Sequence, residues 1–365
     1  MTWLSSSVIA SLVSLLTLVI LYPQAPRIGL MDHPGERRRI HRQAVPRIGG
    51  LALFAGIFAG IFAGIHLTPT LSSVHWYGFS GAALLVLVGA LDDCFQLGAK
   101  RRLLAQTGAA LLLTLGGGVQ LSSLGDLLGM GPLDLGPLAL PFTLFAIVGV
   151  INAINMVDGI DGLAGGLVAI ALISVMFLMP LPSTLSFLLL CCLAALVPVL
   201  VCNLELFGCH HRKVFLGDAG SMLLGYLLAW AMITAAETPD GITPVTALWL
   251  VAIPLTDSLR VMVRRLLAGR SPFSADRGHL HHVLARCLRS TRYALVVMLA
   301  LAALLAGLGS TGLLLALPEP IMFYAALLLA GVYVLALGSV RRWYRRALAT
   351  RGLMLSPTCA QVSED

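Results

Sequence analysis

Long apolar runs alternate with short polar segments along the whole chain. Eleven of these runs approach the length of about 20 residues that a transmembrane helix needs. They cover residues 4–22, 48–66, 77–91, 103–117, 138–151, 163–180, 185–202, 214–235, 244–262, 293–315 and 321–340. Backbone groups in lipid must be hydrogen-bonded internally, and the runs are too long for barrel strands. The pattern therefore predicts an all-α, polytopic membrane bundle of about eleven transmembrane helices, with ten as the alternative count.

The composition agrees with a membrane protein and excludes an ordinary soluble domain. Hydrophobic residues make up 58% of the chain, charged residues only 11%, and the mean hydropathy is +0.92. A soluble domain has about a quarter of its residues charged. We expect one membrane domain over residues 1–346 and a short cytoplasmic tail over 347–365. The first run follows no basic segment, so we expect its helix to be retained rather than cleaved as a signal peptide.

Basic residues separate to one side of the predicted bundle. If the runs cross the membrane alternately, all 24 Lys and Arg residues fall on the same side. They occupy the segments 27–47, 100–102, 212–213, 260–292 and 341–351. The positive-inside rule makes this side cytoplasmic, with a periplasmic N-terminus and a cytoplasmic C-terminus. The net charge of +7 is thus explained by the topology, which places the basic loops beside anionic lipid headgroups. No nucleic-acid partner is expected.

Four groups of residues, polar except for Phe215, share the predicted cytoplasmic side. Asp92 and Asp93 form the first group, at the end of an apolar run. The other groups are Asn152, Asn155, Asp158 and Asp161; Asn203, Lys213, Phe215 and Asp218; and Arg264, Arg265, His279, His281 and His282. Ionisable groups near a membrane are costly, so these residues require water, a cation, a partner charge or a substrate around them.

Aspartates gathered with basic residues suit the joint binding of a divalent cation and a phosphate. Mg²⁺ takes one or two protein oxygens and completes its shell with water and phosphate, and Asp218 and the amide oxygen of Asn155 are the candidate ligands. Phosphoryl transfer needs mainly this positioning and charge neutralisation. Asp92 or Asp93 is a candidate base, because two adjacent carboxyl groups are not both easily ionised in a confined site. Helix capping is the simpler interpretation of any single aspartate, but it does not account for the set.

Four motifs follow one another in a fixed order between the apolar runs. They are Asp92-Asp93, Asn155-x-x-Asp158-Gly-x-Asp161-Gly, Phe215-x-Gly-Asp218-x-Gly-Ser221 and His279-x-His281-His282. In this order they resemble the polyprenyl-phosphate N-acetylhexosamine-1-phosphate transferases, the MraY/WecA-like enzymes of glycosyltransferase family 4. The resemblance runs from about Asp32 to His282 and so covers most of the chain.

Two branches of this family compete. The peptidoglycan branch, which transfers phospho-MurNAc-pentapeptide, usually has three consecutive histidines, whereas Leu280 interrupts the run here. The segment from Trp249 to Asp257, with Arg264-Arg265 and Ser271-Pro-Phe-Ser, looks like the WecA branch. That branch transfers GlcNAc-1-phosphate, or a related HexNAc-1-phosphate, to undecaprenyl phosphate. The resemblance thus favours the WecA branch and leaves the peptidoglycan enzyme as the alternative.

The resemblance also implies a reaction and a role for each residue. The lipid phosphate attacks the sugar-bearing phosphorus of UDP-HexNAc and yields polyprenyl-diphospho-HexNAc and UMP. Mg²⁺ or Mn²⁺ bridges the diphosphate from Asp218 and Asn155, and Asp92 or Asp93 takes the proton. The other assignments are Asp158 and Asp161 for the nucleotide or metal-bound water, Phe215 and Asn203 for the uracil, His279, His281, His282, Arg264 and Arg265 for phosphates or sugar, and Arg42, Lys100, Lys213 and Asn152 for further substrate contacts.

The expected setting is the bacterial inner membrane, with the active site on its cytoplasmic face. UDP-HexNAc, undecaprenyl phosphate and membrane lipid are the expected partners, and a homodimer is an open alternative. The product would begin a cell-envelope polysaccharide such as O-antigen or enterobacterial common antigen. The competing class is a transporter of an anionic lipid or phosphate. Transporters place charges near the midplane in broken helices and often show inverted repeats, whereas here the charges cluster at one rim.

Overall fold

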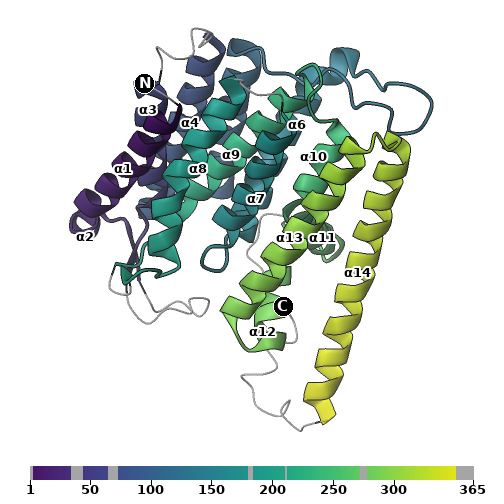
Figure 1. Cartoon of the computed structure of the whole chain (residues 1–365). Coiled ribbons are helices and arrows are strands. Elements are labelled where there is room, and N and C mark those ends of the chain that lie inside the picture. The colour runs from purple at the N-terminus through teal and green to yellow at the C-terminus, as the bar shows by residue number, and fades with distance from the viewer. Residues whose placement is uncertain are drawn as a thin grey trace.

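Every apolar run predicted from the sequence coincides with a helix in the computed structural model (Figure 1). The structure describes residues 3–33, 44–64, 73–179, 184–209, 212–271 and 278–350. The first helices are α1 (Trp3–Leu21), α2 (Ala25–Ile28), α3 (Gly49–Ala63), α4 (Ser73–Phe95), α5 (Ala99–Leu111) and α6 (Ala139–Val157). The later ones are α7 (Leu163–Leu178), α8 (Thr184–Asn203), α9 (Gly217–Ala236), α10 (Pro244–Leu250), α11 (Ala252–Leu267), α12 (Leu280–Leu288), α13 (Thr291–Leu314) and α14 (Glu319–Thr350).

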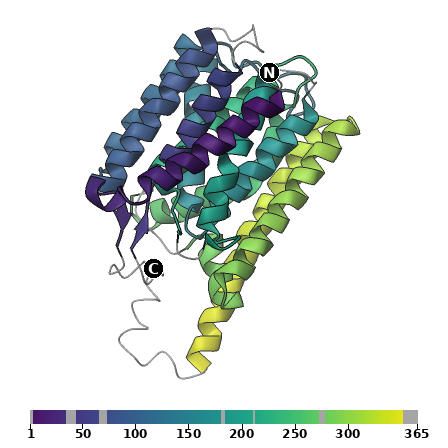
Figure 2. The same cartoon turned by 60° about the vertical axis from the view of Figure 1, so that its left-hand side comes forward.

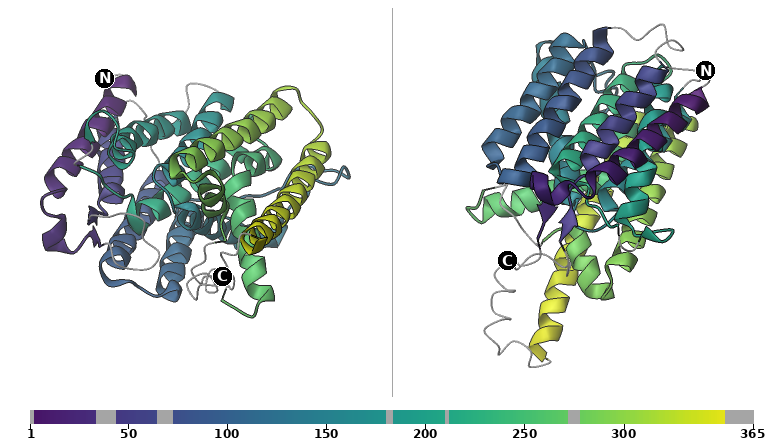
Figure 3. Two further views of the ribbon diagram at one scale, coloured as in Figure 1. Left: turned by 90° about the horizontal axis from the view of Figure 1, so that it is seen from below. Right: turned by 90° about the vertical axis from the view of Figure 1, so that its left-hand side faces the viewer.

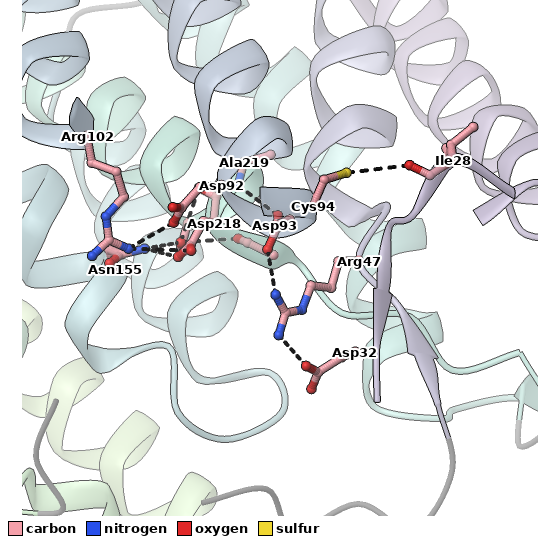
Figure 4. A network of polar contacts seen from close by, with 12 residues as sticks. Ile28, Asp32, Arg47, Asp92, Asp93, Cys94, Arg102, Asn155, Asp218 and Ala219 are labelled. Carbon is pink, nitrogen blue, oxygen red and sulfur yellow. Dashed lines mark hydrogen bonds and ion pairs between the residues drawn. The ribbon is translucent and has the colours of Figure 1, made fainter. Parts of the chain in front are cut away.

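Four smaller elements accompany the helices. A π-helical stretch, Leu112–Gly116, extends α5, and a 3-10 turn, Gly136–Leu138, precedes α6. The strands β1 (Met31–Asp32) and β2 (Val45–Pro46) pair antiparallel, with Met31 opposite Pro46. This short hairpin brings Asp32 and the residue after β2 close to the end of α4, as Figure 4 shows.

Within the described residues, seven helices are long and apolar enough to cross a membrane, and the chain is a multi-pass membrane protein. These are α1, α4, α6, α8, α9, α13 and the first part of α14. An eighth span results if α10 and α11 are counted together, and α3 and α7 are shorter apolar helices. The remaining run, 103–117, corresponds to α5 and its π-helical extension. The all-α class is confirmed, whereas the count of eleven crossings stays a prediction.

Helix α9 is the centre of the bundle. Nearly all of its residues are buried, and it packs against α3, α4, α6 and α7. Small residues allow such close contact between membrane helices. A Cβ on Gly50 of α3 would collide with the backbone of Gly220, and one on Gly89 of α4 would collide with Ala219. The two glycines therefore let α3 and α4 approach the beginning of α9, where Asp218 lies.

The polar motifs and the described parts of the basic segments lie at one end of the bundle. In Figure 1 the hairpin β1–β2, the loop after α6, the segment before α9 and helix α12 all lie at the lower end. The N-terminus and the segment 118–137, which has no Lys or Arg, lie at the upper end. This arrangement matches the segregation predicted from the sequence, and the assignment of the lower end to the cytoplasm stays a prediction.

A sharp bend separates α10 from α11. The two helices form an angle of 79°, so α11 runs sideways instead of continuing down the bundle in the direction of α10 (Figure 3). Pro254 explains the position of the bend. A proline N has no hydrogen to donate to the carbonyl four residues earlier, which here is that of Leu250 at the end of α10. Helix α14 packs against α10 and α11 at one flank and extends past the other helices (Figure 2).

Candidate functional site

Two carboxylates, Asp92 and Asp218, gather around Arg102, and a third, Asp93, lies beside them (Figure 4). Asp92 and Asp93 lie near the end of α4, and Asp218 lies in the first turn of α9. The Arg102 guanidinium on α5 donates to Asp92 Oδ2 at 3.1 Å and to Asp218 Oδ2 at 3.5 Å. Asp92 Oδ1 is buried, and within the described residues it has no hydrogen-bond partner. One positive charge therefore balances two carboxylates, and one buried acceptor is left for a proton or a cation.

Asn155 and Asp218, the predicted metal ligands, are in direct contact. Asn155 Nδ2 donates to Asp218 Oδ1 at 2.7 Å and to Ser221 Oγ at 2.9 Å. Rotating the amide by a half-turn would present its oxygen to the same space. The pair was predicted from its chemistry alone, and the structure brings its two members, 63 positions apart, into hydrogen-bonding distance.

A second arginine, Arg47, holds Asp93 from the opposite side. It follows β2, forms an ion pair with Asp32 of β1, and reaches Asp93 Oδ1 at 3.3 Å (Figure 4). Burial opposes the charge on Arg47, but the carboxylates of Asp93, Asp32 and Asp218 outweigh it and raise its pKa above the ordinary value. Asp93 Oδ2 also accepts the backbone N–H of Ala219 at 3.4 Å. These contacts fix Asp93 between the hairpin and α9.

Arg47 and Arg102 were not among the candidate site residues predicted from the sequence. Lys100, which was a candidate, is exposed at the start of α5, whereas Arg102 two positions later reaches the carboxylates. Residues two positions apart on a helix point in different directions. The helical period could therefore have indicated that Lys100 and Arg102 do not face the same site. Arg47 lies between Pro46 and the Gly49-Gly50 pair, within the part of the chain that the resemblance covers but outside its four motifs. Arg42 lies outside the described residues.

A polar cavity of about 500 Å³ opens beside the carboxylates. Its walls come from all four predicted motifs and from the hairpin. They include Asp32, Arg47, Asp93, Asp158, Asp161, Asn203, Lys213, Phe215, Asp218 and His282. Segments that are distant in sequence therefore contribute to one chamber at the predicted cytoplasmic end.

Two loops of the cavity are joined by Asn203 at the end of α8. Its Oδ1 accepts the N–H of Gly162 at 2.6 Å, and its Nδ2 donates to the carbonyl of Val214 at 2.9 Å. Lys213 lies in the same region, with Nζ 2.6 Å from Asp161 Oδ2 and 5.5 Å from the centre of the Phe215 ring. Asn203 thus fixes the backbone on both sides of the wall that carries Asp161, Lys213 and Phe215.

Negative charge dominates the chamber and changes the ionisation of Asp158. Burial, followed by the charges of Asp218, Asp93 and Asp161, raises the pKa of Asp158 to about 8. A carboxyl group in such surroundings keeps its proton near neutral pH. A bound cation would reverse this effect, because it would be the largest charge in the site.

The three histidines of the last motif divide between two environments. His282 lines the cavity, whereas His279 and His281 are only 4% and 1% exposed. His279 Nδ1 lies 2.8 Å from Asp257 Oδ2. Burial, with the neighbouring His282 and His279, lowers the pKa of His281 to about 3, so its ring is neutral at physiological pH. His282 is therefore the member of the motif that the structure brings to the chamber.

Arg264 and Arg265 lie in the last turn of α11, and Arg265 is buried at 5% exposure. Neither belongs to the described walls of the polar cavity. Their predicted contact with phosphate or sugar stays a prediction. Asn152, one turn before Asn155 on α6, turns to another partner and donates to Gln106 Oε1 at 2.7 Å.

An apolar groove of about 700 Å³ lies along α6. Its walls come from α5, α6, α9, α10 and α11, with Leu103, Phe145, Met232, Leu248 and Leu259 among the lining residues. Asn152 lies in this groove, whereas Asn155, one helical turn away, contacts Asp218. The groove and the carboxylate cluster therefore meet at α6.

The oxygen-rich chamber suits a hard divalent cation. Within the described ranges, no three His, Cys, Asp or Glu side chains form a ready chelating group. A site for Mg²⁺ does not require one, because this ion usually takes one or two protein oxygens and several from water and phosphate. Asp92 Oδ1, which has no hydrogen-bond partner among the described residues, and the Asn155–Asp218 pair provide oxygen ligands of the right kind. The residues present thus fit Mg²⁺, and Mn²⁺ accepts a similar donor set.

Comparison with known proteins gives a consistent result. The family model described as glycosyl transferase family 4 matches residues 75–236, which include three of the four motifs. The undecaprenyl-phosphate alpha-N-acetylglucosaminyl 1-phosphate transferase of Escherichia coli (strain K12) is 37% identical over 291 residues, 78% of this chain and 77% of its own length. Proteins of the same name from Yersinia pestis and Pasteurella multocida are each 38% identical, covering 88% and 94% of this chain and 88% and 96% of their own lengths.

Proposed function

The chain belongs to glycosyl transferase family 4, and we propose that it transfers GlcNAc-1-phosphate from UDP-GlcNAc to undecaprenyl phosphate. The products are undecaprenyl-diphospho-GlcNAc and UMP. The observation that carries this proposal is the agreement in name of relatives that match three quarters or more of the chain. The shape of the site supports it, since a polar chamber and an apolar groove adjoin the same helix.

The polar chamber is the proposed site of the donor. Its volume of about 500 Å³ is within the range for small-molecule sites. Phe215 provides a ring face for the uracil, and Lys213 and Arg47 provide positive charge for the diphosphate. Asn203 acts indirectly, because both ends of its amide already bind backbone groups. His282, at the wall, contacts the outer oxygens of the phosphate or the sugar.

The apolar groove is the proposed site of the first part of the prenyl chain. Its surface is almost entirely hydrocarbon, with Asn152, Thr107 and Ser258 as polar exceptions. A lipid that lies in this groove has its phosphate directed toward Arg102 and the carboxylates, because Asn152 and Asn155 are separated by one turn of α6. The arrangement places an apolar tail and a charged head on adjoining surfaces.

In the proposed reaction, an oxygen of the lipid phosphate bonds to the sugar-bearing phosphorus of the donor. The bond from this phosphorus to the bridging oxygen breaks, and UMP leaves. When bound, Mg²⁺ or Mn²⁺ supplies positive charge that offsets the diphosphate. Asp218 and Asn155 would hold the cation. Asp92, with its unpartnered oxygen, and Asp93 orient the lipid phosphate and accept a proton from it where one remains.

Asp158 and Asp161 form the floor of the same chamber. Asp161 fixes Lys213 through their ion pair. The protonation state of Asp158 sets the amount of negative charge beside Asp218. We further propose that the chamber opens to the cytoplasm at the bacterial inner membrane, where the basic segments are expected. The product then begins a cell-envelope polysaccharide.

Release of UMP from the purified protein tests the proposal. The enzyme is assayed with undecaprenyl phosphate, Mg²⁺ and, in separate reactions, UDP-GlcNAc, UDP-GalNAc or UDP-MurNAc-pentapeptide. We expect UDP-GlcNAc to give the fastest release. Turnover of UDP-MurNAc-pentapeptide alone would assign the protein to the peptidoglycan branch. Lipid or phosphate flux across vesicles, with no UMP from any donor, would refute the enzyme and support a transporter.

A further inference from the structure

A buried carboxylate outside the polar chamber joins three helices. Asp257 on α11 is 0% exposed. Its Oδ2 faces His279 Nδ1 at 2.8 Å, and its Oδ1 accepts the N–H of Leu280 at 3.1 Å and the hydroxyl of Tyr333 at 2.6 Å. Leu280 is the first residue of α12, and Tyr333 lies on α14. One carboxylate therefore connects α11, the beginning of α12 and α14.

Arg260, one turn after Asp257, strengthens this connection. It donates to Asp257 Oδ1 at 3.1 Å and to the carbonyl of Gly278. Its guanidinium lies 5.9 Å from the centre of the Tyr333 ring. A buried ion pair is stabilising only when its geometry is good and its remaining donors and acceptors are satisfied. Tyr333 serves the acid through its hydroxyl, which donates to Asp257, and its ring lies beside the Arg260 guanidinium, whose Nε is buried with no hydrogen-bond partner among the described residues.

The segment held in this way leads directly to the wall of the chamber. The rings of His279 and His281 are nearly parallel, with centres 5.6 Å apart, and the centres of His281 and His282 are 4.2 Å apart. On its other side His281 packs against the loop after α6. A Cβ on Gly159 would collide with His281 Nε2, so the two surfaces are in contact. A movement of His279 would therefore displace His281, His282 and the loop that carries Asp158.

We propose that Tyr333 is a positioning residue for donor binding. By donating to Asp257 it fixes His279 and the first turn of α12, and it thereby sets the place of His282 at the chamber wall. Tyr333 itself does not belong to that wall. The inference rests on the proposed function in one respect, that the chamber holds the UDP-sugar. Through Tyr333, helix α14 then has a role in substrate binding in addition to its role as a membrane helix.

The variant Tyr333→Phe tests the inference, since it removes the hydroxyl and keeps the ring over Arg260. Tyr324→Phe is the matched control, because Tyr324 lies on the same helix and is 53% exposed. We expect Tyr333→Phe to raise the KM for UDP-GlcNAc about tenfold, or about 1.4 kcal/mol. The KM of Tyr333→Phe for undecaprenyl phosphate should stay within about twofold of the wild-type value, a shift below about 0.5 kcal/mol. The KM values of Tyr324→Phe for UDP-GlcNAc and for undecaprenyl phosphate should stay within the same limit. Equal KM values for UDP-GlcNAc in the two variants would overturn the inference.

A double-mutant cycle distinguishes positioning from a general loss of structure. If Tyr333 acts through the histidine segment, its hydroxyl matters less once His282 is gone. We therefore expect Tyr333→Phe to change the KM for UDP-GlcNAc less than about twofold when it is added to His282→Ala. If the effects of the two substitutions multiply, they act independently, and the inference is wrong.

Hydrogen–deuterium exchange provides a measurement that does not depend on activity. The N–H of Leu280 is bonded to Asp257, so peptides covering residues 278–288 should exchange faster in Tyr333→Phe than in the wild type or in Tyr324→Phe. Unchanged exchange would overturn the inference whether or not UMP is released. Faster exchange in a protein that releases no UMP would support the anchoring by Tyr333 and refute the proposed function.

Discussion

Replacing Asp218 by asparagine separates its part in cation binding from its part in stability. The side-chain volume is kept, and the new amide still offers an acceptor to the N–H of Asn155. The lost ion pair with Arg102 spans 3.5 Å between side chains that are 27% and 30% exposed. A partly exposed pair of this kind contributes at most about 1 kcal/mol. We therefore expect Asp218→Asn to fold, with little change in its melting temperature.

The effect on the cation should be larger than the effect on folding. Loss of a second-shell partner already weakens metal binding by about 10- to 100-fold, and a direct ligand should reach at least the upper end of this range. A 100-fold loss corresponds to about 2.7 kcal/mol, which exceeds the stability change. We expect UMP release by Asp218→Asn to need about 100-fold more Mg²⁺ for half-maximal rate.

The measurement is a Mg²⁺ titration of UMP release, together with thermal unfolding in the same detergent. Asp126→Asn is the matched control, because Asp126 lies in the segment 118–137 at the opposite end of the bundle and accepts a backbone N–H from Gly131 at 3.0 Å. Its titration curve should coincide with that of the wild type. A curve for Asp218→Asn within about threefold of the wild type would refute the assignment of this residue to the cation, since threefold is only about 0.7 kcal/mol.

Three further predictions concern other residues of the site. Phe215→Leu should raise the KM for UDP-GlcNAc about tenfold through lost stacking, whereas Phe207→Leu, 92% exposed in the same segment, should not; equal values would contradict the uracil assignment. Because the pKa of Asp158 is about 8, its proton competes with Mg²⁺, so the Mg²⁺ needed for half-maximal UMP release should fall as pH rises toward 8. Asp158→Asn should flatten this dependence, and an unchanged slope would exclude Asp158 as its source. The pKa of His281 is lowered from 6.5 to about 3, so the unfolded chain binds more protons between these values and stability is lost as pH falls below 6.5; His281→Asn should reduce that loss in thermal unfolding, and an equal loss would contradict it.

Much of the fold could be predicted because membrane helices leave a strong hydropathy signal. All eleven apolar runs correspond to helical segments, and the basic residues indicated which segments share an end. The bend between α10 and α11 was missed, because the run 244–262 was interpreted as one apolar span although it includes Asp257 and Arg260. Pro254 indicates the bend, because it lacks a backbone N–H, but a hydropathy pattern does not detect this missing hydrogen-bond donor.

The residues of the candidate site could be predicted from the sequence more fully than the contacts between them. The pairing of Asn155 with Asp218 followed from their chemistry and shared side of the membrane. The ion pairs of Arg47 and Arg102 did not follow, because side-chain distances across helices depend on packing that a single sequence does not encode locally. The histidine motif illustrates the same limit. Its three rings were treated as one group, whereas the structure separates His282 from the two that are buried near Asp257.

The single turn of α6 between Asn152 and Asn155 has a consequence for inhibitor design. Three residues of helix rise about 4.5 Å, so the apolar groove and the carboxylate cluster are close enough for one small molecule to occupy both. A uridine-like head joined by a short linker to a branched alkyl chain would combine two weak contacts into one tight ligand. Such a compound would exploit the closeness of the two surfaces, which a nucleotide analogue alone does not use.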